Sequence, residues 1–491
     1  MVVVDMIPRS TPTTTTQSTK TIPTTSVATS TTVLRPGVTF DTVVNDIATS
    51  STAYLGRSQQ HRMYFDSVHK LYWYFYCSGV LSSSSPRDNM PLVLVAYRVN
   101  ATDDGATWGP EHTVSQAACS QGSGGRIDFA FSGTTVYMVL TNTTGAISAF
   151  YTQHGILGYG TINWMGSEVT TSTGSCSAND NPDLVIASDG TLWVSMWVMC
   201  GASGTWTYEV WKSTSGGASW TLEDSVVPQS GGNSFIEPIY ASGITDGLVF
   251  GYAGSTQGTD KAITTFFVIT TNGGSTWTQA VETPATYLSC QVAGTSELGS
   301  SVAYYVGVTA VGYSNPLSYG GVNFWTVSST DTLSPVTVLA TTGYVWASIG
   351  SDGSNELVVF AGSLTGGLAM WTSSNRGGTW NGPITLFSSG QRYYSKGGTV
   401  PIIQNGDQYF AAAWTYNDSL SSATGVPVDF MFAEANAANG QISTLSGLGG
   451  LQVHSTNLFE FSLGMVAAGL VIITYGLAAP ESGTPRGGRR K

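Results

Sequence analysis

Short apolar runs separated by polar turns fill most of this chain. The run at 70–76, K-L-Y-W-Y-F-Y, is rich in aromatic residues and apolar at successive positions. Successive residues of a strand point to opposite faces, so such a run predicts a strand that is buried on both sides. Before residue 460 no long stretch has the period of an amphipathic helix. The pattern therefore predicts an all-β chain.

One octapeptide turn occurs four times, each time behind an apolar run, as A-T-D-D-G-A-T-W, S-T-S-G-G-A-S-W, T-T-N-G-G-S-T-W and S-S-N-R-G-G-T-W. The copies lie at 101–108, 213–220, 270–277 and 373–380. A short Asp, Asn or Ser at the third position can cap its own turn, and Gly at the fifth supplies a positive φ. Trp at the eighth position is expected to be buried against the next repeat.

This octapeptide resembles the Asp box, or BNR repeat, of sialidase-like β-propellers. The resemblance implies a single β-propeller built from four-stranded blades. Degenerate copies are expected at 158–164, where Trp164 stands, at 328–335 and at 435–442. Together they predict seven repeats across roughly 40–450. Six blades are the alternative, because the last repeat has the poorest copy.

A second marker is a tight turn between two apolar runs, typical of a hairpin. Glycines in six of these turns follow one another at steps of 52 to 57 residues, which suits a four-stranded repeat. The predicted hairpin turns are 66–70, 131–135, 188–191, 245–247, 297–300, 351–354 and 405–407.

The two ends of the chain differ from its middle. Residues 1–39 are rich in Thr, Ser and Pro and predict a flexible stalk. After a linker at 451–460, residues 461–480 carry no charge, and about 20 residues of helix suffice to cross a bilayer. A transmembrane helix is therefore expected there, with a buried C-terminal helix as the alternative. The basic tail at 481–491 predicts a cytoplasmic end, which puts the propeller outside, on a cell or virion surface.

Composition narrows the choice of partners and cofactors. Only 10% of residues are charged and the formal net charge is −12, which predicts no binding to nucleic acid. A glycan or a surface protein is the expected partner, besides the membrane. No cofactor and no metal site are predicted, since the chain has no C-x-x-C and no H-E-x-x-H. Calcium at 179–183, N-D-N-P-D, is a minor alternative to a capped turn.

The five cysteines are odd in number. Cys176 and Cys200 fall within one repeat and could form a disulfide. Cys77 with Cys119 is a second candidate pair.

The innermost strands of a propeller line its central channel, and ligands usually meet their ends. Charged residues concentrate where these strands are expected to begin, which is notable in a chain so poor in charge. The candidates are Arg62, Asp66, Arg126, Asp128, Asp183, Glu237 and Arg392.

The resemblance implies a specific set of site residues. Sialidases clamp a carboxylate with three arginines, attack with a Tyr activated by a Glu, and use an Asp as acid and base. Glu237 resembles the Glu that precedes a D-G turn, Tyr394 or Tyr393 could stand for the nucleophile, and Asp128 or Asp66 for the acid. The chain has no F-R-I-P motif near the first repeat. The strand after Glu237, L-V-F-G-Y-A-G, also lacks the expected arginine.

The arginine set is therefore incomplete or rebuilt. A structural alternative is that these carboxylates pair with neighbouring arginines around the channel. The sequence favours a membrane-anchored extracellular propeller that binds a glycan or protein partner at its channel mouth. One alternative is an exo-α-sialidase-like glycoside hydrolase acting on surface glycans. Another is a structural surface-layer or virion component.

Overall fold

A computed structural model shows strands and turns over most of the region 38–436. The residues it describes are 38–47, 61–82, 92–99, 108–119, 127–141, 149–174, 176–187, 189–200, 205–226, 236–244, 247–255, 263–281, 289–296, 302–310, 319–328, 330, 334–352, 355–363, 368–387, 392–404, 407–417 and 428–436.

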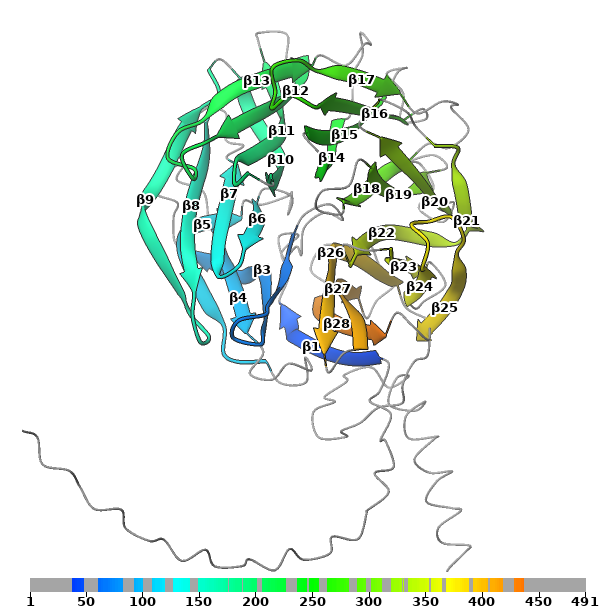
Figure 1. Ribbon diagram of the computed structural model, residues 1–491. Helices are drawn as coiled ribbons and strands as arrows, with labels where there is room; N and C mark the ends of the chain where they lie inside the picture. The colour runs from blue at the N-terminus through cyan, green and yellow to red at the C-terminus, as the bar shows by residue number, and fades with distance from the viewer. Residues whose placement is uncertain are drawn as a thin grey trace, which may run out of the picture. The chain divides into compact units, whose positions relative to one another are not determined.

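The described strands form seven antiparallel sheets of four strands each (Figure 1). The prediction of an all-β chain with four-stranded sheets is confirmed. The first sheet consists of β2 (Met63–Asp66), β3 (Leu71–Ser82), β4 (Leu92–Val99) and β5 (His112–Cys119). The second consists of β6 (Ile127–Ser132), β7 (Thr135–Thr141), β8 (Ala149–Leu157) and β9 (Ile162–Ser172). The third consists of β10 (Cys176–Ile186), β11 (Leu192–Cys200), β12 (Thr205–Ser213) and β13 (Thr221–Val226).

The fourth to sixth sheets repeat this order. The fourth sheet consists of β14 (Ile236–Ile244), β15 (Gly247–Ser255), β16 (Ile263–Thr270) and β17 (Thr278–Val281). The fifth consists of β18 (Ser289–Ser296), β19 (Val302–Ala310), β20 (Tyr319–Ser328) and β21 (Thr337–Thr342). The sixth consists of β22 (Tyr344–Ser351), β23 (Leu357–Ser363), β24 (Leu368–Ser373) and β25 (Asn381–Phe387).

The seventh sheet is assembled from both ends of the described chain. It contains β26 (Arg392–Gln404), β27 (Asp407–Asn417), β28 (Val428–Asn436) and β1 (Val38–Ile47). β1 pairs antiparallel with β28, with Val38 opposite Ala435. The fourth strand of this sheet is therefore β1. The sequence pattern placed the start of the chain in a stalk up to residue 39 and did not predict this pairing.

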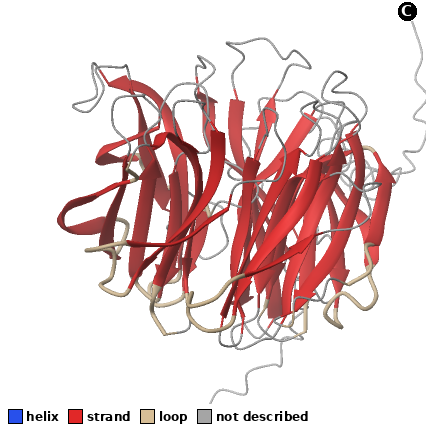
Figure 2. Ribbon diagram, turned by 90° about the horizontal axis from the view of Figure 1, so that it is seen from above, coloured by secondary structure: helices blue, strands red, loops and turns tan. Residues whose placement is uncertain are grey.

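The first strands that are labelled in Figure 1, namely β6, β10, β14, β18, β22 and β26, lie at the inner side of their sheets. β26 contacts both β22 and β2, and the successive inner strands from β6 to β22 contact one another in chain order. Each inner strand is joined to its neighbour in the sheet by a hairpin at one of the predicted turns, for example 67–70 and 133–134. Most of the described turns gather at one end of the strands (Figure 2). The starts of the inner strands therefore lie at the opposite end.

The copies at 213–220, 270–277 and 373–380 lie between the third and fourth strands of their sheets. In the copy at 270–277, Thr270 Oγ1 accepts a hydrogen bond from Gly274 N and Asn272 Oδ1 accepts one from Thr276 N, both at 2.9 Å. The copies at 213–220 and 373–380 repeat both bonds. The fifth-position glycines have φ values of +90°, +91° and +84°, so the predicted roles of the third and fifth positions are confirmed.

Three of the eighth-position tryptophans pack against the preceding sheet, whereas Trp108 lies edge-on to Tyr74 of its own sheet. Trp220 lies edge-on to Phe150 of β8, and Trp380 lies edge-on to Phe324 of β20, with ring centroids 5.5 and 4.9 Å apart. Trp277 contacts Trp193 of β11 in the same way. The expectation that each Trp is buried against the next repeat is wrong in direction. Because the sheets are twisted, the outer turn of a sheet packs on only one of its two neighbouring sheets. The turn sequence does not show which of the two neighbours that is.

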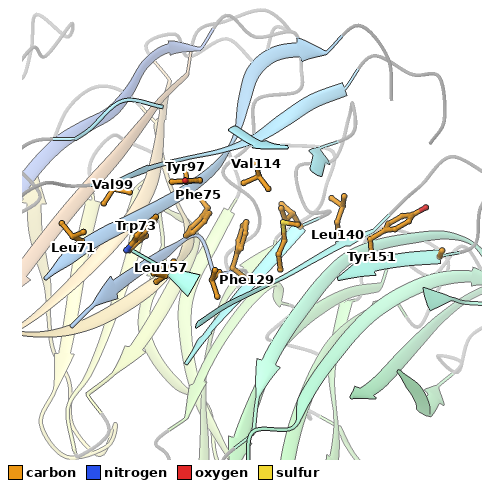
Figure 3. Packing of buried hydrophobic residues seen from close by; sticks show 14 residues of the cluster. Leu71, Trp73, Phe75, Tyr97, Val99, Val114, Phe129, Leu140, Tyr151 and Leu157 are labelled. Atoms are coloured by element: carbon orange, nitrogen blue, oxygen red, sulfur yellow. The ribbon is translucent and has the colours of Figure 1, made fainter. Parts of the chain in front are cut away.

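The core consists of aromatic and aliphatic side chains between adjacent sheets. One cluster joins the first two sheets and includes Trp73, Phe75, Tyr97, Phe129 and Leu140 (Figure 3). Phe75 and Phe129 come from different sheets and have ring centroids 4.2 Å apart. Strands such as β3 are buried on both faces, as the sequence predicted.

Cys176 and Cys200 form a disulfide between β10 and β11, so this predicted pair is confirmed. Cys77 lies on β3 and Cys119 on β5, and the pairing of these two stays a prediction.

Several predictions fall on parts of the chain outside the described residues: the stalk up to residue 37, the linker 451–460, the span 461–480 and the tail 481–491. Within the described residues, no helix has the length and apolar character needed to cross a membrane.

Candidate functional site

Three charged side chains belong to, or directly precede, successive inner strands. Arg62 directly precedes β2 and Asp128 is the second residue of β6. Asp183 was expected at the start of its strand but lies well inside β10, which begins at Cys176. All three are fully buried, at 0% exposure. Buried charges of this kind are stabilised only by partners, since their transfer from water is costly. We refer to these residues, together with His61, as the mouth cluster.

Asp128 connects three sheets. Its Oδ1 accepts a hydrogen bond from His61 N at 2.6 Å, and its Oδ2 accepts one from Leu184 N at 2.7 Å. His61 precedes the first sheet, and Leu184 belongs to the third. Both carboxylate oxygens are therefore used to hold neighbouring sheets together.

Arg62 places a guanidinium beside this carboxylate. Burial lowers the pKa of Arg62 to about 10, and the negative charge of Asp128 opposes that shift. The side chain therefore remains a cation at neutral pH. Its Cζ also lies 5.9 Å from the centre of the Phe129 ring, within range of a cation–π contact.

His61 is the member of the mouth cluster that reaches solvent. Its side chain is 29% exposed, and its Nδ1 lies 3.5 Å from Asp128 Oδ2. The sequence analysis did not select this histidine among the five in the chain. Its position directly before Arg62, at the expected start of an inner strand, is the signal that could have identified it.

Among the residues that the structure describes, two sets of side chains have the spacing of metal ligands. Ligand atoms of His61, Asp128 and Asp183 lie within 4.8 Å of one another. The charge of Arg62 beside Asp128 opposes a cation there, and Asp128 already accepts two backbone hydrogen bonds. The second set contains Cys176 and Cys200, whose sulfurs form the disulfide. Calcium binding at 179–183 stays a prediction.

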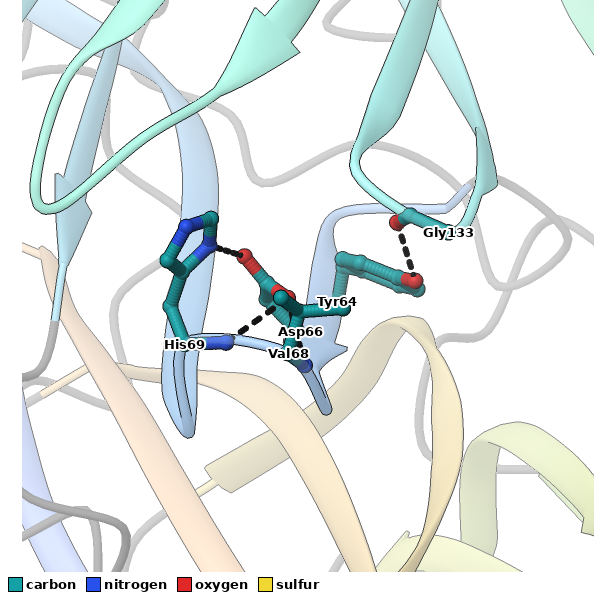
Figure 4. Close-up of polar contacts among 5 residues, drawn as sticks. All are labelled: Tyr64, Asp66, Val68, His69 and Gly133. Carbon is teal, nitrogen blue, oxygen red and sulfur yellow. Dashed lines mark hydrogen bonds and ion pairs between the residues drawn. The ribbon is translucent and has the colours of Figure 1, made fainter. Parts of the chain in front are cut away.

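Asp66 lies at the other end of β2, away from the mouth cluster. Its Oδ1 accepts hydrogen bonds from Val68 N and His69 N, and its Oδ2 lies 2.5 Å from His69 Nδ1 (Figure 4). The hydroxyl of nearby Tyr64 donates to the carbonyl of Gly133 in the next sheet. Burial, and then the charge of Asp66, raise the pKa of Tyr64 to about 12. Because its carboxylate accepts the hydrogen bonds from Val68 N and His69 N, Asp66 caps the first hairpin turn.

The other candidates are placed by their backbone or lie outside the described residues. Glu237 is the second residue of the inner strand β14. Arg392 and Tyr394 stand at the start of β26, which contacts β2. Arg126 lies just before β6, outside the described part of the chain. The backbone thus puts Glu237, Arg392 and Tyr394 at or near the starts of their own inner strands.

No protein-family model matches the chain, and no curated protein sequence matches it. Several solved structures, in contrast, have a similar fold. A polysaccharide lyase, the PL25 ulvan lyase, aligns with a TM-score of 0.50 at 6% identity over 79% of this chain and 94% of the lyase. This likeness supports the propeller-like all-β fold.

Other similar structures align less well. Trypanosoma rangeli sialidase in complex with the inhibitor DANA gives a TM-score of 0.45 at 11% identity over 89% of this chain. The chain spans 63% of the length of that sialidase. Penicillium chrysogenum α-L-arabinanase, complexed with arabinobiose, gives 0.40 at 13% identity, over 61% of this chain and 89% of the arabinanase.

Proposed function

We propose that this chain is a seven-bladed β-propeller that binds a glycan at the end of its channel where the inner strands begin. The mouth cluster is the observation that carries this proposal. Arg62, Asp128 and Asp183 concentrate buried charge there in a chain with only 10% charged residues, and His61 faces solvent beside them. The ulvan lyase, whose fold is similar, acts on a polysaccharide, which agrees with a glycan ligand.

Binding is favoured over catalysis by the contacts of Asp128. A general acid must present an oxygen to its substrate. Asp128 is fully buried, and each of its oxygens accepts a backbone N–H. Arg62 is buried too and does not offer a guanidinium face to a ligand in solution. A sialidase-like hydrolase would have to rely on Glu237, Tyr394 and the arginines at 126 and 392.

A glycan array probed with the full-length chain tests this proposal. We expect binding that weakens at least about tenfold in Arg392→Ala and His61→Ala, since each removes a hydrogen-bond donor from a residue at the start of an inner strand or just before it. His112→Ala, on the outer strand β5, is the matched control and should bind normally. Equal binding by all variants would contradict a ligand at this mouth.

A fluorogenic α-sialoside separates binding from hydrolysis. We expect no turnover by the wild-type chain. Turnover that disappears in both Glu237→Gln and Tyr394→Phe would show a glycoside hydrolase instead.

We also propose that residues 461–480 anchor the propeller at an outer surface. The uncharged span followed by a basic tail supports this. The full-length chain should stay with membranes in high salt and leave them only in detergent. Val471→Arg should weaken the association, because a central arginine costs about 3 kcal/mol on insertion. Release of the wild-type chain by salt alone would contradict the anchor.

A further inference from the structure

A cavity of about 210 Å³ lies between the second and third sheets. Its walls come from β7, β8 and β9 on one side, and from β10, β11 and the repeated turn at 213–220 on the other. None of the mouth-cluster residues lines it. It is smaller than the roughly 300–1,000 Å³ typical of pockets for drug-sized ligands. It therefore suits one small ring.

A bulge in β9 shapes one wall of the cavity. Thr152 pairs with Val169 and His154 pairs with Met165, so three residues of β9 face the single residue Gln153. Gly166 adopts φ +68° within this bulge. Bulges bend a strand and redirect its side chains. Here Met165 and Ser167 line the cavity from the bulged strand.

Trp220 forms part of the facing wall and is held in place. Its Nε1 lies 3.2 Å from both Thr152 Oγ1 and Gly217 O. Its ring stands edge-on to Phe150 at 5.5 Å. The indole therefore enters the cavity wall in a fixed orientation, and Met165, 45% exposed, adds apolar surface at the rim.

The polar part of the lining consists of groups that both donate and accept hydrogen bonds. Gln153, His154 and Ser167 are of this kind. Gln153 Nε2 also reaches the carbonyl of Gly166 at 3.5 Å, which places the amide at the bulge. Among the lining residues that the structure describes there is no carboxylate, ammonium or guanidinium. Such a lining matches sugar hydroxyls, which also donate and accept, and supplies no carboxylate, ammonium or guanidinium as a counter-charge for an ionised ligand.

We propose that this cavity binds a single neutral pyranose ring, as a second carbohydrate site distinct from the channel mouth. The apolar C–H face of the ring packs against Trp220 and Met165, and its hydroxyls bond to Gln153, His154 and Ser167. The site lies beside a repeated turn, so this turn positions a ligand wall in addition to joining two strands. The proposal does not depend on the channel mouth, because the two sites share no residue.

Saturation-transfer NMR on the full-length chain tests the site. The probes are the methyl glycosides of glucose, galactose, mannose and N-acetylglucosamine, with glucuronic acid and cyclohexanol as comparators. We expect saturation transfer to at least one neutral glycoside and none to glucuronic acid. Ser167→Trp fills the cavity and should abolish the transfer. Gln153→Ala and His154→Ala should each weaken binding at least about fivefold.

Asn163→Trp is the matched control, since Asn163 is also exposed on β9 but does not line the cavity. It should bind like the wild type, as should the channel variant His61→Ala, and both tryptophan variants should melt within a few degrees of the wild type. No transfer to any neutral glycoside overturns the proposal, and so does transfer that survives Ser167→Trp. Transfer to cyclohexanol alone assigns the cavity to apolar molecules and also overturns it. Loss of transfer in His61→Ala would place the sugar at the channel mouth instead.

Discussion

Asp128 Oδ1 accepts a hydrogen bond from the backbone N–H of His61 at 2.6 Å, across two neighbouring sheets. The same carboxylate accepts Leu184 N of the third sheet, and its charge faces Arg62. One buried side chain thus satisfies backbone donors on both sides of its own strand. We infer that Asp128 fixes the spacing of the inner strands at the channel mouth.

Replacing Asp128 should therefore be strongly destabilising. We expect Asp128→Asn to lower the free energy of unfolding by about 3 kcal/mol, because it removes the counter-charge of buried Arg62 and weakens one backbone bond. Asp128→Ala should cost more. Urea unfolding of the full-length chain measures both. Asp189→Asn is the control: Asp189 is exposed and accepts Thr191 N in a hairpin turn, so it should cost less than about 1 kcal/mol. Equal losses at both positions would contradict the role given to Asp128.

Two glycines at the same position of the repeated turn should differ in how much stability is lost when alanine replaces them. Gly217 has φ +90° with no atom closer than 3.7 Å to an added Cβ, so Gly217→Ala should cost only the backbone strain, about 1–2 kcal/mol. In Gly377, with φ +84°, the added Cβ would overlap the ring of Phe324. Gly377→Ala should therefore cost about 3 kcal/mol or more. Thermal or urea unfolding compares the two, and equal costs would show that the ring of Phe324 moves aside freely.

The tryptophans of the repeated turns should stabilise the fold without taking part in the channel site. We expect Trp380→Ala to cost about 3–5 kcal/mol, since it removes the ring that packs on Phe324 of the preceding sheet. Trp380→Phe should recover part of this loss. Glycan binding by the folded fraction should be unchanged. A variant that unfolds normally but no longer binds would instead make this turn part of the channel site.

Glu209 should make stability depend on pH. Burial raises the pKa of this carboxyl from 4.5 to about 6, although the hydrogen bond from Trp211 Nε1 opposes the shift. The folded state therefore binds more protons than the unfolded state between these pH values, and stability falls as pH rises through this window. The shift corresponds to about 2 kcal/mol.

Glu209→Gln should remove this dependence, because the neutral amide keeps an acceptor for Trp211. We compare the free energy of unfolding of the variant with that of the wild type at two pH values. The difference in favour of the variant should be about 2 kcal/mol larger at pH 7 than at pH 4.5. Glu111→Gln, at an exposed carboxylate, is the control. A constant difference between Glu209→Gln and the wild type across this range would contradict the burial effect.

Local signals predicted much of the fold. The octapeptide turns specified their own hydrogen bonds, because Asn272 and Gly274 act within a few residues of each other. The hairpin turns and the four-stranded sheets followed from residue types and spacing. The disulfide between Cys176 and Cys200 followed from their place in one repeat. Each of these features depends on neighbours that are close in sequence.

The candidate site was predicted only in part. Arg62, Asp128 and Asp183 were chosen because they were expected at the starts of inner strands. The structure places Arg62 and Asp128 there, whereas Asp183 lies well inside β10, which begins at Cys176. Asp66 was chosen by the same rule, but it is the last residue of its short strand and caps a turn. His61 and Leu184 were missed as partners of Asp128, because a backbone N–H carries no signature in the sequence.

The sequence by itself determined the strand content, the repeat length and the chemistry of each turn, since these depend on local propensity and on side chains within a few residues. Only the tertiary structure decided which sheet each turn tryptophan packs against, that β1 completes the seventh sheet beside β28, and that a bulge opposite Gln153 opens a cavity. These features depend on sheet twist and on pairings between segments far apart in the chain. Such relations emerge only when the sheets pack together, because the free energy that selects them belongs to the assembled sheets rather than to any one segment.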